Sequence, residues 1–160
     1  MQNGTRSELP RLVVLVGLPG SGKSTWAKQQ GVAVLSSDDT RFLLADDEND
    51  QTIHGDVFAT VRYLLRRRLE LRRPLTFIDA TNLTRRERRA YIKTAQLYDC
   101  QVEAMFFDTP AEVCKERNRV RTRVVPDDVI DAMAQRLSVP TIEEGFDVVM
   151  AYRSGGIATP

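Results

Sequence analysis

A glycine-rich segment near the start of the chain has the residue types and spacing that bind phosphate. It follows the apolar run 12–16 and reads Gly17-Leu18-Pro19-Gly20-Ser21-Gly22-Lys23-Ser24-Thr25. The spacing Gly-x4-Gly-Lys-Ser matches the Walker A pattern in full. Glycines let successive backbone N–H groups wrap a phosphate chain at the positive end of a helix. The segment therefore predicts binding of ATP or another nucleoside triphosphate.

Two side chains of this segment are expected to act on the transferred phosphate. Lys23 is predicted to lie along the β- and γ-phosphates, and the Ser24 hydroxyl is predicted to complete a Mg²⁺ site on the same oxygens. The rest of the predicted phosphate-binding set is Gly17, Pro19, Gly20, Ser21, Gly22 and Thr25. The open question is then which group receives the phosphate.

A second group of candidate residues, one acidic and one basic, follows the predicted strand 32–35. Phosphoryl transfer to a hydroxyl needs a group that accepts the hydroxyl proton, and a carboxylate at Asp38 could do this with a gain of about 10²–10⁴-fold in rate. Arg41, three residues later, would lie on the same side and could hold an anionic group of the acceptor. The residues alone leave open that Asp38 is only a helix N-cap and that Arg41 is only a surface residue.

Asp79 comes directly after the apolar residues 75–78, in the position of a Walker B carboxylate. It would either bind the Mg²⁺ shell, through water from beside Ser24, or orient Arg41 across the crevice. The sequence does not separate these two roles. A turn with Asn82 at the end of the strand is the structural alternative.

A cluster of arginines follows the fourth predicted strand. Arg117 and Arg121 are four residues apart on a predicted helix, which places them on one face. In P-loop kinases this region commonly forms a lid, and a well-placed arginine that closes on the donor phosphates contributes about 10³–10⁵-fold to the rate. We then expect Arg119 and Arg123 to face solvent or backbone phosphates.

Short apolar strands alternate with helical patterns along the chain, which favours a parallel α/β sheet with helices on both faces. Strands are predicted at 12–16, 32–35, 75–78, 102–107 and 146–152, and helices at 23–30, 53–73, 85–97, 110–121 and 126–137. We expect a P-loop kinase fold with a five-stranded sheet in the order 2-3-1-4-5, closed by a helical lid. Residues 1–160 are expected to form one domain, with 1–10 and 153–160 as loose tails.

Composition excludes several classes of protein. The chain has 160 residues, of which 28% are charged and 42% apolar, as in a globular domain. It has no apolar run of about 20 residues and no signal peptide pattern, so a cytoplasmic protein without a membrane anchor is expected. Its net charge of +1 argues against non-specific coating of nucleic acid. The arginine clusters at 62–73 and 85–89 are expected to be mostly solvated helix faces.

Taken together, the motifs resemble one known family. They are the phosphate loop, Ser36-Ser37-Asp38-x-x-Arg41, the acidic stretch 46–52, Asp79-Ala80-Thr81-Asn82 and Glu116-Arg117-Asn118-x-x-Arg121. This set, over residues 11–152, resembles the 5′-OH polynucleotide kinase module of bacterial end-healing RNA-repair enzymes, within the P-loop phosphotransferase superfamily. The resemblance implies Mg²⁺-dependent transfer of the γ-phosphate of a nucleoside triphosphate to the 5′-hydroxyl of an RNA or DNA end.

The resemblance also assigns roles to individual residues. It implies that Asp38 is the general base and that Arg41 contacts a phosphate of the acceptor. Asp79 would support that arginine or the metal shell, and Arg117 would grip the donor phosphates. Gln51 and Val129 match positions that contact the terminal nucleoside.

Alternatives remain at this point. A small-molecule kinase of the gluconate, shikimate or zeta-toxin type also combines a P-loop with an acidic residue after the second strand, and a regulatory nucleotide switch would have no acceptor. Motifs of a phosphatase or a ligase are absent from the sequence, so we expect a stand-alone kinase or one module that works with other end-healing or ligase domains or proteins. The oligomeric state and the preference for RNA or DNA are not predicted.

Overall fold

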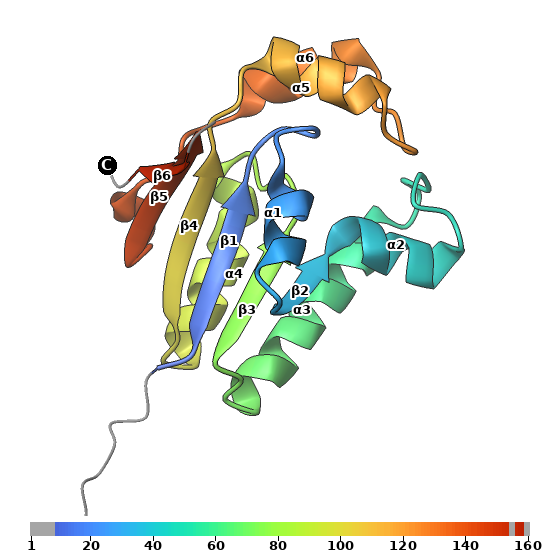
Figure 1. Cartoon of the computed structure of the whole chain (residues 1–160). Coiled ribbons are helices and arrows are strands. Elements are labelled where there is room, and N and C mark those ends of the chain that lie inside the picture. The colour runs from blue at the N-terminus through green and yellow to red at the C-terminus, as the bar shows by residue number, and fades with distance from the viewer. Residues whose placement is uncertain (1–8, 154–155, 159–160) are drawn as a thin grey trace, which may run out of the picture.

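A six-stranded sheet runs through the residues that the computed structural model describes, 9–153 and 156–158. The strand order is β2-β3-β1-β4-β5-β6 (Figure 1). The strands are β1 (Arg11–Val16), β2 (Ala33–Ser36), β3 (Leu75–Asp79), β4 (Gln101–Phe107), β5 (Val148–Arg153) and β6 (Gly156–Ala158). The first five strands are parallel and have the predicted order 2-3-1-4-5, which confirms the predicted fold class.

Helices cover both faces of this sheet. They are α1 (Lys23–Gln29), α2 (Ser37–Ala45), α3 (His54–Glu70), α4 (Arg85–Leu97), α5 (Ala111–Arg119), α6 (Asp127–Arg136) and the short 3-10 helix η1 (Ile142–Glu144). Figure 1 shows α1 in front of the sheet, α4 behind it, and the pair α5 and α6 above the ends of the central strands. We call α5, α6 and the segment between them the lid. Within the described residues, no helix is long and apolar enough to span a bilayer.

Alternate side chains of β1 explain why both faces are covered. Leu12, Val14 and Val16 pack with the apolar residues of α3 and α4 in one core cluster. Val13 and Leu15 point to the opposite face and pack with residues of α1. Because β1 is the central parallel strand, its carboxyl end opens onto the crevice where open α/β sheets bind ligands.

The second strand is followed directly by α2, which begins at Ser37. The reason is the side chain of Ser36, which accepts a hydrogen bond from the backbone N–H of Asp39 and so caps the helix. Asp38 is therefore not the N-cap. It lies in the first turn of α2, with its side chain free for other contacts.

The end of the chain also differs from the prediction. Residues 153–160 were expected to be a loose tail, but Arg153 ends β5 and Gly156–Ala158 forms β6, which pairs with β5 in antiparallel orientation. That expectation is wrong for these residues. Residues 1–8, 154–155 and 159–160 lie outside the described part of the chain.

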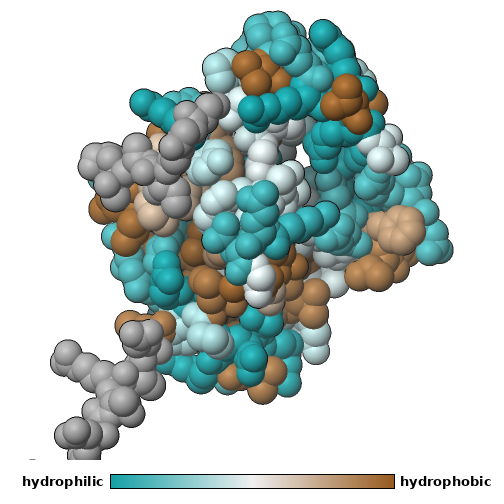
Figure 2. All heavy atoms as spheres, viewed as in Figure 1, coloured by the Kyte–Doolittle hydropathy of each residue, from teal (hydrophilic) through white to brown (hydrophobic). Residues whose placement is uncertain are grey.

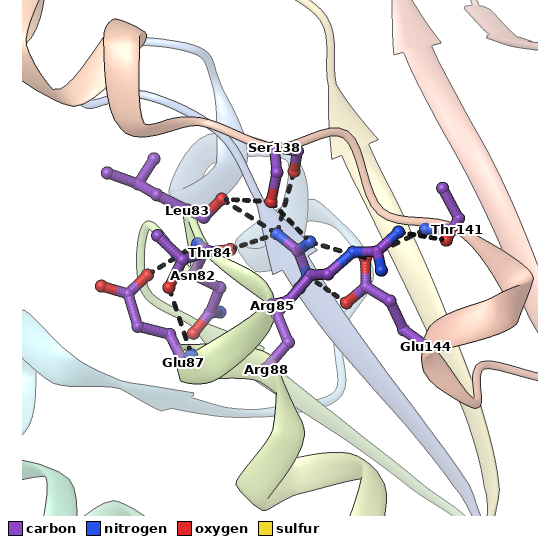
Figure 3. Close-up of polar contacts among 9 residues, drawn as sticks. All are labelled: Asn82, Leu83, Thr84, Arg85, Glu87, Arg88, Ser138, Thr141 and Glu144. Carbon is purple, nitrogen blue, oxygen red and sulfur yellow. Dashed lines mark hydrogen bonds and ion pairs between the residues drawn. The ribbon is translucent and has the colours of Figure 1, made fainter.

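The arginines at 85–89 were expected to be mostly solvated, and Arg85, Arg86 and Arg89 are exposed. Arg88 is the exception, because its side chain is fully buried. Figure 3 shows its polar contacts. Its guanidinium donates two hydrogen bonds to the carboxylate of Glu144. It also donates to the carbonyl oxygens of Asn82 and Leu83 and to both oxygens of Ser138. The side chain therefore joins the start of α4 to the segment that leaves the lid.

Candidate active site

A pocket of about 970 Å³ lies at the carboxyl edge of the sheet, beneath the lid. Figure 2 shows a hollow at this place, bordered largely by hydrophilic side chains of the lid and of the α2 region. The predicted site residues that line it are Pro19, Gly20, Ser21, Gly22, Lys23, Ser24, Thr25, Asp38, Arg41, Gln51, Asp79, Arg117, Arg121 and Val129. Gly17 does not line it, and its backbone N–H bonds the carbonyl oxygen of Thr81 behind the loop.

The phosphate loop depends on two glycines with left-handed backbone conformations. Gly20 has a φ of 82° and Gly22 a φ of 100°, which residues with a Cβ rarely adopt. A Cβ on Gly20 would lie 2.4 Å from the carbonyl oxygen of Cys114 in α5. The loop is thus packed directly against the lid, and α1 begins at its end.

Lys23 is the buried cation of this loop. Its ammonium donates hydrogen bonds of 2.9 Å to the carbonyl oxygens of Gly17 and Leu18. Burial lowers the pKa of Lys23 to about 8, and the nearby negative charge of Asp79 partly opposes this shift. Because burial disfavours the charged form of Lys23, an incoming anion would stabilise that form.

Asp79 contacts Ser24 and not Arg41. The Ser24 hydroxyl donates a hydrogen bond of 2.6 Å to Oδ2 of Asp79, whose side chain is buried at the end of β3. A hydroxyl and a carboxylate at this distance form a set of hard oxygen donors, which is what Mg²⁺ prefers. Among the described residues, no group of three or more His, Cys, Asp or Glu side chains is placed to hold a metal. One carboxylate fits an ion that takes its remaining ligands from phosphates and water.

Asp38 is held by two arginines from different parts of the chain. Nη1 of Arg41 donates to its Oδ1 at 3.2 Å, and Nη1 of Arg123 donates to the same oxygen. The Asp38 side chain is 37% exposed, whereas that of Arg41 is 4% exposed. Nε of Arg41 is buried and has no hydrogen-bond partner among the described residues. The site therefore offers an accessible carboxylate beside an unsatisfied guanidinium donor.

Arg123 is the site residue that the sequence analysis missed. We expected it to face solvent or backbone phosphates, but it reaches Asp38 from the lid and its side chain is 19% exposed. The fully buried amide of Asn118 explains its position, because it bonds both the N–H and the carbonyl oxygen of Val125. The intervening segment is thereby closed into a loop over the pocket. Pro126, which starts the next helix, was the available signal for such a turn.

The other lid arginines are also placed differently from the prediction. α5 ends at Arg119, so Arg121 lies beyond it and does not share a helix face with Arg117. Both nevertheless line the pocket, and the positive charge of Arg121 contributes to the lowered pKa of Lys23. Arg119 is exposed and pairs with Asp127. Before α5, Pro110 occupies the N-cap position and the Thr109 hydroxyl donates to the carbonyl oxygen of Ser21 in the phosphate loop.

Aromatic side chains complete the pocket on the side of α3. His54 and Phe58 both line it, and their ring centroids are 4.7 Å apart. Trp26 also lines the pocket while it stacks on Phe77.

Comparisons with known proteins agree with this geometry. The AAA domain family matches residues 12–140. The bifunctional polynucleotide phosphatase/kinase of Schizosaccharomyces pombe is 26% identical over 148 residues, which cover 88% of this chain. The chain spans about a third of that curated relative, 33% of its length.

Two solved structures show the same fold. One is the Pnkp1/Rnl/Hen1 RNA repair complex, with a TM-score of 0.71 and 20% identity over 99% of this chain and 51% of the matched chain. The other is a gluconokinase from Sinorhizobium meliloti 1021, with a TM-score of 0.59 and 18% identity over 91% of this chain and 85% of the other. At these identities the two matches support the fold and do not decide the acceptor.

Proposed function

The chain belongs to the AAA domain family, and from that premise we propose that it is a polynucleotide 5′-hydroxyl kinase, which uses Mg²⁺ and ATP or another nucleoside triphosphate. The observation that carries the proposal is the position of Asp38, which lies in one pocket with the phosphate loop and between Arg41 and Arg123. A carboxylate in this position would serve as the proton acceptor, with two cations beside it, at the point where an acceptor hydroxyl would meet the donor. We further propose that residues 1–160 form a single kinase domain that works with end-healing or ligase domains or proteins.

The donor half of the site is formed by the phosphate loop and the lid. Lys23 and the loop N–H groups would bind the β- and γ-phosphates, and Arg117 and Arg121 would neutralise the charge that develops on the transferred group. Ser24 and Asp79 would hold Mg²⁺, which supplies further positive charge at these oxygens.

The acceptor half is formed by α2 and the loop before α3. The 5′-oxygen attacks the γ-phosphorus, the bond from that phosphorus to the β–γ bridging oxygen breaks, and Asp38 takes the hydroxyl proton. The products are a 5′-phosphate end and a nucleoside diphosphate. Arg41 would bind the phosphate next to the terminal nucleoside, because its buried Nε lacks a partner and guanidinium groups bind phosphate well. Gln51 and Val129 would contact that nucleoside.

The choice of a polynucleotide acceptor rests on the motif set and on the relative that is named a polynucleotide phosphatase/kinase. It is tested by transfer of radiolabelled γ-phosphate from ATP, with Mg²⁺, to RNA and DNA oligonucleotides of one sequence with 5′-hydroxyl ends. We expect label on at least one of them and none on the same oligonucleotides with 5′-phosphate ends. Label on gluconate or shikimate, with none on any oligonucleotide, would show a small-molecule kinase instead.

The buried ammonium of Lys23 predicts a pH dependence of nucleotide binding. A bound triphosphate favours the charged form and so raises the pKa of Lys23 above its value of about 8 in the free protein. Above pH 8 the free protein has lost this proton and must take it up on binding. The dissociation constant for ATP is therefore expected to rise by up to about tenfold per pH unit between pH 8 and the raised pKa, and to change little between pH 6.5 and 7.5.

Isothermal titration calorimetry in buffers with different ionisation enthalpies measures both the affinity and the proton uptake. Lys23→Gln should bind ATP more weakly at pH 7 and without this proton uptake. Lys28→Gln removes a lysine from the same helix, outside the pocket, and should behave as the wild type. Equal proton uptake by Lys23→Gln and the wild type would rule out Lys23 as the group responsible.

A further inference from the structure

A stripe of aromatic and basic side chains leads from the pocket along α3. It consists of His54, Phe58, Arg62 and Arg66, which follow one another at four-residue spacing. They form one ridge of neighbouring side chains that turns by about 40° round the helix axis at each step. His54 and Phe58 line the pocket, whereas the two arginines do not. With a rise of about 1.5 Å per residue, the backbone positions of Arg62 and Arg66 lie ~12 and ~18 Å along the helix from His54.

The two arginines of the stripe differ from Arg67, Arg68 and Arg72 in their contacts. Arg67 pairs with Glu70, and Arg68 and Arg72 donate to neighbouring hydroxyl or carbonyl oxygens. Within the described residues, by contrast, the side chains of Arg62 and Arg66 make no hydrogen bond and no ion pair. Two guanidinium groups of the stripe are therefore available to an anion from outside.

Both arginines lie on the side of α3 that faces α4. The charge of Arg62 acts on Tyr91 and that of Arg66 on Tyr98, where each lowers a phenol pKa that burial raises. Ala59 and Tyr63, three residues before Arg62 and Arg66, line a separate small depression that borders the stripe on its other side. The stripe thus forms one continuous path from the pocket towards the far end of α3.

We propose that the acceptor strand leaves the pocket along this stripe, with Arg62 and Arg66 bound to the phosphates that follow the terminal nucleotide and a base stacked on the His54–Phe58 pair. Proteins that bind single strands combine arginine or lysine along the backbone with aromatic rings under the bases, and the stripe has both in this order. The inference rests on the proposed function. A small-molecule acceptor would end within the pocket and would not reach either arginine.

The test compares the KM of two 5′-hydroxyl acceptors, a dinucleotide and a hexanucleotide. At about 3.4 Å per stacked nucleotide, the hexanucleotide reaches Arg66 and the dinucleotide does not reach Arg62. We expect the wild type to have a KM about tenfold lower for the hexanucleotide. The variant Arg62→Gln/Arg66→Gln should lose this advantage, so that its two KM values agree within about twofold. Its slope of log KM against log salt concentration for the hexanucleotide should fall by about 1.4, the value for two contacts with a single strand.

Two further variants separate a phosphate contact from a general effect of charge or stability. Arg67→Gln/Arg73→Gln removes the same charge near the end of α3, outside the stripe, and should keep the length advantage. Arg62→Lys/Arg66→Lys keeps the charge and should keep the salt slope. Fluorescence anisotropy measures the binding of a 3′-labelled hexanucleotide without turnover. The Arg62→Gln/Arg66→Gln variant should bind it more weakly than the wild type and Arg67→Gln/Arg73→Gln do.

The outcomes separate this inference from the proposed function. If the wild type labels both acceptors but with equal KM, the stripe does not bind the acceptor strand and the kinase assignment stands. The inference also fails if Arg67→Gln/Arg73→Gln loses as much of the length advantage as Arg62→Gln/Arg66→Gln. If the wild type labels neither acceptor, the proposed function itself is wrong.

Discussion

Replacing Asp38 by asparagine is expected to lower the rate of phosphoryl transfer to a 5′-hydroxyl by about 10²–10⁴-fold, the usual contribution of a positioned general base. Asparagine has nearly the same shape and can still accept a hydrogen bond from Arg41 or Arg123, so the pocket should keep its form. It cannot take the hydroxyl proton. Loss of the carboxylate also leaves both guanidinium groups without their counter-charge, which should not weaken the binding of an anionic nucleotide.

Single-turnover transfer to an oligonucleotide and calorimetric binding of ATP measure the two effects separately. Asp39→Asn provides the matched control, because Asp39 is the next residue of the same helical turn and does not line the pocket. We expect its rate to stay within about threefold of the wild type, as for a surface substitution. If Asp38→Asn also stayed within that range, Asp38 would not be the base.

Replacing Arg88 by leucine is expected to lower the free energy of unfolding by about 3–5 kcal/mol, because it leaves the buried carboxylate of Glu144 with only the long ion pair to Arg85, at 3.8 Å, and the N–H of Thr141. The carbonyl oxygens of Asn82, Leu83 and Ser138 lose their donor as well. For a domain of this size the loss corresponds to a fall of ~6–20 °C in the melting temperature. Urea unfolding and thermal unfolding both measure it.

The matched control is Arg89→Leu, which removes the next arginine of α4, an exposed side chain. Its effect should stay within about 0.5 kcal/mol. The double variant Arg88→Leu/Glu144→Leu should recover part of the lost stability, because it removes the buried charge together with its partner. If Arg88→Leu unfolded no more easily than Arg89→Leu, the buried network would not contribute to stability as described.

The fold and the position of the phosphate loop at the end of β1 could be predicted because their signals are local. The Walker A spacing sits between an apolar strand and a helix, and each later strand ends in a recognisable turn or cap. The capping box of Thr84 and Glu87, for example, fixes the start of α4 at the predicted residue. Strand order then follows from the limited set of connections that parallel sheets allow.

The start of α2 could not be predicted to the residue. Ser36, Ser37, Asp38 and Asp39 are all good N-caps, so propensity does not choose among them. The structure selects Ser36, and this choice determines that the Asp38 side chain is left for Arg41 and Arg123. The contact to Arg123 joins residues 85 positions apart and depends on the path of the lid, which no local pattern describes.

The burial of Arg88 was missed for a different reason. Composition does not distinguish the arginines of 85–89 from one another, but their positions round the helix do. Arg88 precedes Tyr91, Ile92 and Ala95 by three, four and seven residues, so it occupies the position of a core residue on α4. An arginine at an apolar position indicates a buried ion pair, and only the tertiary structure supplies Glu144.

The close approach of Gly20 to Cys114 limits how the lid can move. Because no side chain separates the phosphate loop from α5, α5 cannot come closer to the loop, and the buried contact of Leu18 with Cys114 holds the two together. Just after the lid, both oxygens of Ser138 accept hydrogen bonds from Arg88. α6 is held in turn by Ile130, which lies in the same buried cluster as Leu18 and Cys114. Any opening of the lid would therefore fall mainly on the loop that carries Arg123, which lies between these fixed points.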